Sequence, residues 1–344
     1  MNIDQFISIV TTAPSADNSQ PWLFSNDGRV LSIQYLHRSD KPDPFGAFGH
    51  GALISGGALH ETINTLLELG GQSKKQTSVR TNDQTWILDV PVNAILLADP
   101  ESDYSSIISR HTNRHPFKPL GGASLTLPPN EPSCQMSAIT RRSDIKMLAS
   151  CLKSCSEARF NNQELHEWLF SSIRWTDEEA SNGTGLDVAT LHLPPGGRQF
   201  MRGISPWERM KFLNRFGLYK LMAHADTALF SAAPAIVAFF GKGGVNDIWE
   251  TGKCMQRTWI SLNRQGFAVH PYYAITDLGN RLKNGKLTPP WIKLVNCAQE
   301  NAKKILGLNH DNELHMLFRV GVPRTRPVRS RRLPTSSFFH PPTP

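Results

Sequence analysis

The sequence has 344 residues, of which 39% are hydrophobic and 19% charged. These values are ordinary for a soluble globular enzyme with one large domain or two modest ones. No apolar run reaches the roughly eighteen residues of a membrane helix, and the N-terminus has no signal-peptide pattern. The net charge of +8 favours anionic partners such as phosphorylated cofactors, acidic substrates or nucleic acid. The five cysteines are odd in number and scattered, so we expect reduced thiols and a cytoplasmic protein.

The first informative stretch follows a short amphipathic helix at residues 6–10. Pro14 ends that helix, because it lacks an N–H and restricts the residue before it. Short polar side chains follow, which can bond nearby backbone or a ligand; they are Ser15, Asp17, Asn18 and Ser19, before Gln20-Pro21-Trp22. Polarity alone favours a capped turn between a helix and a strand, with a ligand-binding loop as the alternative.

The next elements alternate between strand and helix patterns. Residues 23–35 are typical of a hairpin around Asn26-Asp27-Gly28. A glycine-rich stretch, residues 46–57, leads to a helix predicted at residues 58–69, and the apolar residues 86–97 predict a strand or strand pair.

A second polar motif is Arg110-x-Thr112-x-Arg114. Two guanidinium groups at this spacing, with a hydroxyl between them, can converge on one phosphate from a turn or a first helical turn. A solvated basic turn is the alternative interpretation of the same residues.

The second part of the chain is predicted to begin with a linker rich in glycine and proline at residues 120–132. The patterns then predict helices at 144–155, 161–174, 246–262 and 296–306, and strands at 231–240 and 315–322. Residues 177–202 are rich in glycine and proline, and we expect a long loop that acts as a lid or binding segment.

Three motifs resemble the nitroreductase family of flavoproteins. They are Pro-Ser-x-x-Asn-x-Gln-Pro-Trp at 14–22, Arg-x-Thr-x-Arg followed by Phe at 110–117, and Gly-x-x-x-Gln-x-x-Trp with Gly-Phe-x-x-x-Pro at 252–271. The order of the motifs is similar to the two-lobed, Acg-like branch, in which two nitroreductase halves are fused in one chain. The basic element Arg331-Arg332 resembles the C-terminal part of the family's phosphate site.

The resemblance implies an α+β nitroreductase-like fold with mixed or antiparallel central sheets flanked by helices, and two pseudo-repeated halves. The expected halves are residues 1–119 and 140–334, with a linker at 120–139, the lid-like loop at 177–202 and a disordered tail at 335–344. It also implies one FMN. The ring and ribityl chain of the flavin would contact Pro14, Ser15, Asn18 and Gln20. The backbone of Val269, His270 and Pro271 would approach the ring. The phosphate would bind Arg110, Thr112, Arg114 and one of Arg331 and Arg332.

The function implied by this resemblance is an FMN-dependent oxidoreductase. A hydride would pass through the flavin from NAD(P)H or a small organic substrate to an acceptor, and the chemistry would belong to the cofactor. Two alternatives are an FMN-sequestering protein with a covered flavin, and a dehydrogenase or oxidase of a biosynthetic intermediate. We expect a monomer or homodimer that uses neither a metal nor a membrane, and no nucleic acid partner, because the basic tail lacks interleaved aromatic residues.

Overall fold

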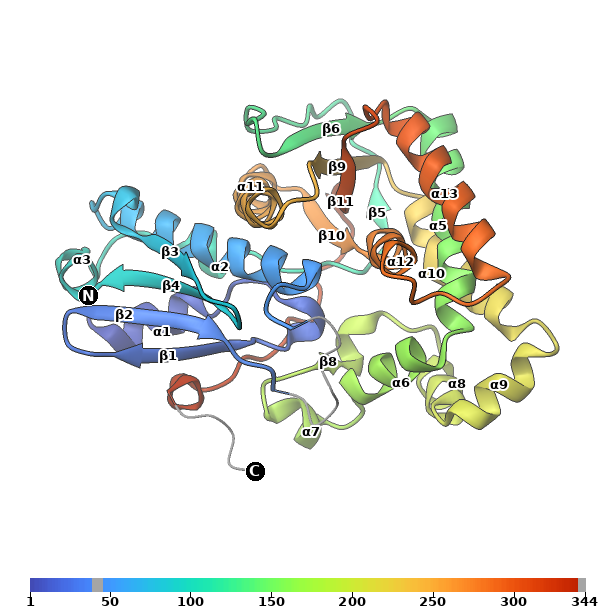
Figure 1. Cartoon of the computed structure of the whole chain (residues 1–344), viewed down its shortest axis with the longest axis horizontal. Helices are drawn as coiled ribbons and strands as arrows, with labels where there is room; N and C mark the ends of the chain where they lie inside the picture. The colour runs from blue at the N-terminus through green and yellow to red at the C-terminus, as the bar shows by residue number, and fades with distance from the viewer. Residues whose placement is uncertain (39–45, 340–344) are drawn as a thin grey trace.

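Two antiparallel sheets stand on either side of a pair of long crossing helices, and further helices surround the second sheet (Figure 1). This arrangement is that of the computed structural model, which describes residues 1–38 and 46–339. The predicted α+β class with antiparallel sheets is confirmed. Within the part of the chain that the structure describes, none of the helices has the length and apolar character needed to cross a membrane.

The first sheet has the strand order β1-β2-β4-β3. Its strands are β1 (Trp22–Asn26), β2 (Val30–Tyr35), β3 (Ser78–Thr81) and β4 (Trp86–Pro91). The predicted hairpin joins β1 to β2, and Gly28 takes the positive φ of 86° that its turn requires. The predicted strand at 86–97 ends at Pro91, and α3 (Val92–Leu97) follows it. A short apolar run does not distinguish a strand from a buried helix, which explains this error.

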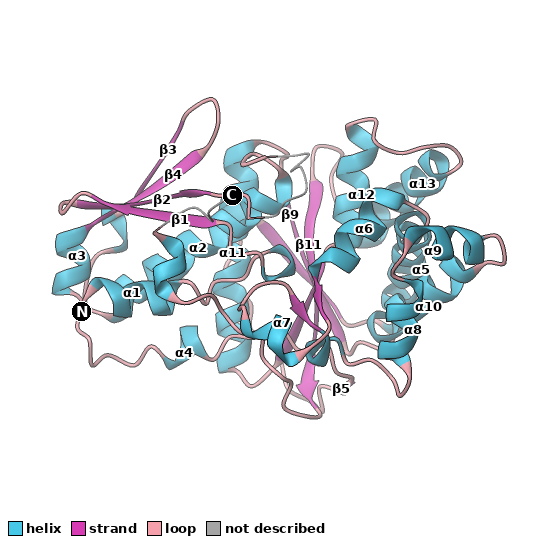
Figure 2. Cartoon of the chain, turned by 90° about the horizontal axis from the view of Figure 1, so that it is seen from below, coloured by secondary structure: helices cyan, strands magenta, loops and turns pink. Residues whose placement is uncertain are grey.

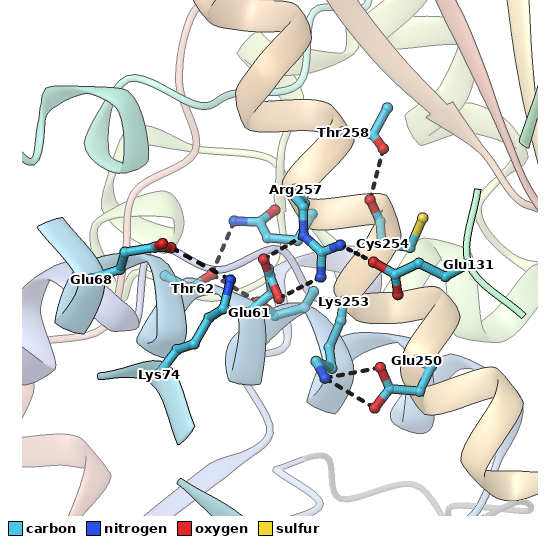
Figure 3. Close-up of polar contacts among 12 residues, drawn as sticks. Glu61, Thr62, Glu68, Lys74, Glu131, Glu250, Lys253, Cys254, Arg257 and Thr258 are labelled. Carbon is cyan, nitrogen blue, oxygen red and sulfur yellow. Dashed lines mark hydrogen bonds and ion pairs between the residues drawn. The ribbon is translucent and has the colours of Figure 1, made fainter. Parts of the chain in front are cut away.

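The helices α2 (His50–Leu69) and α11 (Val245–Arg264) cross at small residues. A Cβ added to Gly57 would lie 2.1 Å from the Trp249 carbonyl oxygen, and one added to Gly252 would lie 2.4 Å from that of Ile54. The helix therefore begins before the predicted residue 58. Gly57 lets its backbone approach α11. Figure 3 shows the polar edge of this crossing, where Arg257 lies between Glu61 and Glu131.

The second sheet has the order β10-β11-β9-β6, with β5 paired to β11. Its strands are β5 (Phe117–Lys118), β6 (Gln135–Ile139), β9 (Ala235–Gly241), β10 (Ala268–Tyr272) and β11 (Glu313–Pro323). Every residue of β9 is buried, as its continuous apolar run predicts. The expected linker at 120–139 extends too far, because residues 135–139 form the edge strand β6, which pairs with β9.

Helices make up most of the remaining regular structure (Figure 2). Five that share a hydrophobic cluster with the second sheet are α5 (Arg142–Phe160), α6 (Gln163–Ser172), α10 (Leu218–Ser231), α12 (Ala274–Lys283) and α13 (Trp291–Leu306). Further helices are α1 (Ile3–Val10), α4 (Ser105–Ile108), α8 (Gly197–Ile204) and α9 (Trp207–Asn214). The 3-10 helices are η1 (Ala16–Asn18), η2 (Lys74–Gln76), η3 (Val188–Leu191) and η4 (Thr335–Phe338).

The segment expected as one long loop, 177–202, consists of short elements. They are α7 (Asp177–Ser181), β8 (Leu186–Asp187), η3 and the start of α8, and β8 pairs in parallel with β7 (Ile173–Arg174). A capping box between Thr176 and Glu179 starts α7. The segment therefore has regular local structure rather than being a single long loop.

The C-terminal segment returns to the first sheet. The expectation of a disordered tail from residue 335 is wrong for residues 335–339, because η4 forms there and Phe338 is fully buried. The Phe338 ring lies edge-on to Phe24 at 5.7 Å between centroids. Residues 340–344, the rest of the expected tail, lie outside the described residues. This return brings the arginines of residues 329–332 back to the N-terminal loop.

Candidate functional site

One cavity of about 1850 Å³ brings together residues from all the sequence motifs. Its lining includes Pro14, Ser15, Asn18, Arg110, Thr112, Arg114, His270, Pro271 and Arg332. Gln20, Val269 and Arg331 are not among its lining residues. Pockets for a single drug-sized ligand have volumes of roughly 300–1,000 Å³, so this cavity has room for a cofactor and a second molecule.

The loop after α1 has a strained backbone. Asp17, Asn18 and Gln20 have positive φ angles of 48°, 57° and 48°, a region in which non-glycine residues are uncommon. Ser15 Oγ accepts a hydrogen bond from the Gln20 N–H at 2.9 Å. Strain of about 1–3 kcal/mol per residue persists only where the surroundings hold it, and it concentrates at functional sites.

The side chains of Asn18 and Gln20 hold this loop to two distant segments. Asn18 Nδ2 donates to the carbonyls of Gly183, Gly185 and Arg331 at 3.0–3.2 Å. Gln20 Nε2 donates to the Gly183 carbonyl at 2.8 Å, while its Oε1 accepts from the Leu333 N–H at 3.2 Å. Gln20 therefore serves the wall of the cavity rather than its interior.

Arg110 is a buried cation. Its Nη2 donates to the Thr12 carbonyl oxygen at 2.7 Å, and its guanidinium carbon lies 4.4 Å from the centre of the Trp259 ring. Its Nε is buried without a hydrogen-bond partner. Among the described residues no carboxylate pairs with Arg110. Burial, followed by the charges of Arg332 and Arg329, holds the pKa of Arg110 well below its usual range.

The two C-terminal arginines point in different directions. Arg332 Nη2 donates to the same Thr12 oxygen at 2.9 Å, and its Nη1 donates to Asn18 Oδ1. Burial and then Arg329 lower the pKa of Arg332 to about 10. Arg331 is exposed and bonds the side chain and carbonyl of Asp177. Arg332 is therefore the arginine that faces the cavity.

Arg110 and Arg114 have different neighbours, although both line the cavity. Arg114 Nη1 donates to Thr190 Oγ1 at 3.3 Å, and burial lowers the pKa of Arg114. The segment that carries them lies beyond α4 and outside regular elements, so it is neither the turn nor the first helical turn that the sequence allowed. The cation that joins Arg110 is Arg332, rather than Arg114 as its spacing predicts.

The segment 110–115 is held in place by the second sheet and α11. The Asn113 N–H donates to the Val269 carbonyl at 2.9 Å, and Trp259 Nε1 donates to the His111 carbonyl at 3.2 Å. Arg319 of β11 is almost fully buried and donates to the carbonyls of Asn113 and His115. The sequence patterns predict no role for Arg319. Its position inside the apolar run at residues 316–322 is the signal that could have found it.

His270 also lines the cavity, from the middle of β10. Burial, followed by the charges of Arg319 and Arg114, holds the pKa of His270 well below its usual range, so the ring is neutral at pH 7. A second polar group that the sequence did not indicate consists of Tyr273 and His50, which line the same cavity and are hydrogen bonded to each other at 2.9 Å.

No protein-family model matches the chain. A Mycobacterium tuberculosis (strain CDC 1551 / Oshkosh) protein, Uncharacterized protein MT1398, is 24% identical over 174 residues, or 49% of this chain. The match spans about a quarter of the length of that relative.

The chain is similar to three solved proteins whose names mention a flavin. A BluB-like flavoprotein from Clostridium difficile 630 is 14% identical with a TM-score of 0.36, over 69% of this chain and 96% of that chain. Iodotyrosine deiodinase bound to FMN and 3-iodo-L-tyrosine is 12% identical with a TM-score of 0.30, over 67% and 94%. The FMN- and NADPH-dependent nitroreductase NfnB from sphigopyxis sp. strain HMH is 13% identical with a TM-score of 0.31, over 63% and 86%. At these TM-scores, the assignment of a cofactor has to come from the residues of this chain.

Proposed function

We propose that this protein binds FMN and is an FMN-dependent oxidoreductase of the nitroreductase type. The observation that carries the proposal is the pair of guanidinium groups of Arg110 and Arg332, which meet at the Thr12 carbonyl oxygen. A buried charge without a partner is costly, and a phosphate monoester would balance two such charges at once.

The donor set fits a phosphate. Arg110 Nε is a buried donor without a partner, and Arg329 and Thr112 line the same cavity. Arg329 Nη2 donates to the carbonyls of Ile108 and Arg110, which brings a third cation to this end of the cavity. We infer that Arg110, Arg332 and Arg329 hold the phosphate, and that Arg114 serves a different part of the ligand.

The remaining motif residues would form the walls for the flavin. Pro14, Ser15, Asn18, His270 and Pro271 line the cavity, and the strained loop at 14–20 is fixed through Asn18 and Gln20. When bound, FMN supplies the exchange of a hydride. The protein would orient the reactants and exclude water, and His270, which is neutral, would add no charge to the wall.

The electron donor in this proposal is NAD(P)H or a small organic substrate. The volume of the cavity supports room for a second molecule beside the cofactor. The donors proposed for the phosphate all lie within one chain, so a monomer would suffice, and a homodimer is the alternative.

A second candidate function is FMN binding with a covered flavin and little turnover. It is favoured by the wall at residues 183–194, which is fastened to the rest of the cavity by hydrogen bonds to Asn18, Gln20 and Arg114. A wall held at these points would restrict access by nicotinamide.

The test is the absorption spectrum of the purified protein, followed by anaerobic addition of NADPH or NADH. A flavin spectrum that bleaches within seconds supports the oxidoreductase. A flavin spectrum that bleaches with dithionite but not with either nucleotide, nor with a panel of organic donors, supports the covered flavin. A colourless protein that cannot be reconstituted with FMN overturns both.

A further inference from the structure

Three side chains, from α2, β11 and the junction between β10 and α12, form a hydrogen-bonded row that ends in the cavity. The Tyr273 hydroxyl lies 2.9 Å from His50 Nδ1, His50 Nε2 lies 3.0 Å from His315 Nδ1, and His315 Nε2 lies 3.0 Å from the Lys242 carbonyl oxygen. Tyr273 and His50 line the cavity, whereas His315 is fully buried behind them in β11. The row thus connects the cavity to the far end of the second sheet.

The Lys242 carbonyl fixes the direction of every hydrogen bond in the row. A carbonyl only accepts, so His315 Nε2 carries a proton and, in the neutral ring, His315 Nδ1 accepts. His50 Nε2 then donates to His315, and His50 Nδ1 accepts from the Tyr273 hydroxyl. The Tyr273 proton points toward His50. The Asn280 side chain faces the Tyr273 oxygen as a hydrogen-bond donor, which leaves the second lone pair of that oxygen to accept a hydrogen bond from a molecule in the cavity.

Burial keeps this row neutral at pH 7. Burial first, then the charges of His315 and Lys283, lower the pKa of His50 to about 3. Burial also lowers the pKa of His315, but the Lys242 carbonyl, Glu313 and Asp247 oppose that effect and Lys283 adds to it. Burial and then Asp277 raise the pKa of Tyr273, while Asn280 and Arg281 act in the opposite direction. A proton that enters the row is therefore better placed on His315, near two carboxylates, than on His50.

We propose that Tyr273 accepts the O–H or N–H group of a ring-containing substrate and takes its proton, and that His50 and His315 relay that proton away from the cavity. The proton of the substrate passes to Tyr273 Oη, the proton of Tyr273 passes to His50 Nδ1, and the proton of His50 Nε2 passes to His315 Nδ1. The substrate is left with one negative charge and His315 becomes an imidazolium, so protons and charge balance.

This inference rests on the proposed function in one respect. A phenol or a ring N–H compound that loses a hydride must also lose a proton, and general-base help with that proton is worth roughly 10²–10⁴-fold in rate. Tyr273 would be the catalytic residue, while His50 and His315 would be positioning residues. The electron donor would then be an organic substrate with an ionisable group, rather than the nicotinamide alone.

The binding test needs neither turnover nor FMN. The probes are 4-nitrophenol, whose phenolate absorbs in the visible, and 4-nitroanisole, which lacks the hydroxyl. The wild-type protein should bind the phenol about tenfold more tightly than the ether, and at pH 6 the bound phenol should show the phenolate band. Y273F should lose the preference, and H315Q should keep the preference but lose the band. The matched control is Y219F. Tyr219 of α10 packs against Trp291 of α13 and does not line the cavity.

A second measurement on the wild-type protein alone guards against variants that fail to fold. Nitrogen-15 NMR of labelled histidines should show His50 and His315 as neutral rings with the proton on Nε2 between pH 6 and 8. A proton on His50 Nδ1, an unchanged preference in Y273F, or a bound phenol that stays neutral in the wild-type protein would each overturn the proposal. Failure of FMN to bind would overturn the proposed function and leave this result unaffected.

Discussion

Arg110 and Arg332 come from segments 222 positions apart in the numbering of the chain, yet both donate to the carbonyl oxygen of Thr12, at 2.7 and 2.9 Å. Two like charges gather at one neutral acceptor only where something else offsets their repulsion. The carbonyl supplies part of that compensation, and the rest is what we assign to a phosphate.

The neighbours Arg331 and Arg332 provide a matched pair of variants. R332A should weaken FMN binding roughly tenfold to a hundredfold, because a charge-assisted hydrogen bond contributes about 1.5–3 kcal/mol. R331A removes an exposed arginine that pairs with Asp177 and should change the affinity less than about threefold. Isothermal titration of the apo proteins with FMN measures both, and equal losses would refute the inward role of Arg332.

Substitution of Arg110 should separate stability from binding. R110M removes a buried cation and keeps most of its apolar stem, so the apo protein should unfold within about 1 kcal/mol of the wild type or at higher denaturant concentration. FMN should then add little stability to R110M, whereas it should raise the unfolding midpoint of the wild type. Urea unfolding with and without FMN checks this, and a large loss of apo stability would show that Arg110 is structural.

The contact between Arg332 and Gly183, at the start of the wall at residues 183–194, can be tested without changing any charge. A Cβ on Gly183 would lie 2.3 Å from the Arg332 carbonyl oxygen, at a φ of +79°. G183A should therefore displace residue 332 and weaken FMN binding at least severalfold. Gly196 has a similar φ of +77° but open space around it, so G196A should bear the same backbone strain and leave FMN affinity unchanged. Similar affinities for the two variants would count against a link between the wall and Arg332.

The stability of the protein should fall as the pH drops below the normal range of histidine. Burial lowers the pKa of His60 to about 3, and its Nδ1 accepts from Trp249 Nε1 at 3.1 Å, which leaves no room for a second proton. His60 binds a proton near pH 6.5 in the unfolded chain but only near pH 3 in the folded protein. The stability that depends on a neutral His60 is therefore present in full above pH 6.5 and is lost as the pH falls toward 3. Each unit of this difference in pKa corresponds to about 1.4 kcal/mol.

Urea unfolding at pH 7.5 and pH 5 measures this loss. H60Q should show a smaller decrease between the two pH values than the wild type. His310 is fully exposed, so H310Q should keep the wild-type decrease. An equal decrease in wild type and H60Q would show that His60 is not held neutral.

The crossing of α2 and α11 makes a prediction about packing. G57A should destabilise the fold by about 1–3 kcal/mol, because the new methyl group would meet the backbone of Trp249 at 2.1 Å. Gly203 is also in a helix and has nothing within 4 Å of an added Cβ, so G203A should be neutral or slightly stabilising. Chemical unfolding of both variants compares them directly, and a neutral G57A would contradict the close crossing.

The sequence predicted most elements whose pattern is long and periodic. The hairpin at 23–35, the helix around Trp249 to Trp259 and the buried strand at Ala235–Gly241 all lie where they were expected. The errors have physical causes. Gly56 and Gly57 lie before the predicted start of the helix at residue 58, because glycine lowers helix propensity, whereas here they permit close packing within α2. The apolar run after Pro91 fits a strand or a helix equally well.

Most of the predicted site residues line one cavity, but the sequence did not predict how they pair. Spacing along the chain joined Arg110 to Arg114, because local sequence contains no information about residue 332 returning to Thr12. The family resemblance also implied that Gln20 contacts the ligand, whereas its amide is hydrogen bonded to Gly183 and Leu333. The row from Tyr273 to His315 joins residues from three separate segments of the chain, and only the tertiary structure brings them together.

The most direct test of the central claim is a parallel titration of the apo protein with FMN and with riboflavin, which differ only in the phosphate. If Arg110 and Arg332 hold that phosphate, FMN should bind at least tenfold more tightly than riboflavin, and the R110M/R332A double variant should bind the two equally. Equal affinities in the wild-type protein, or no binding of either flavin, would contradict the account.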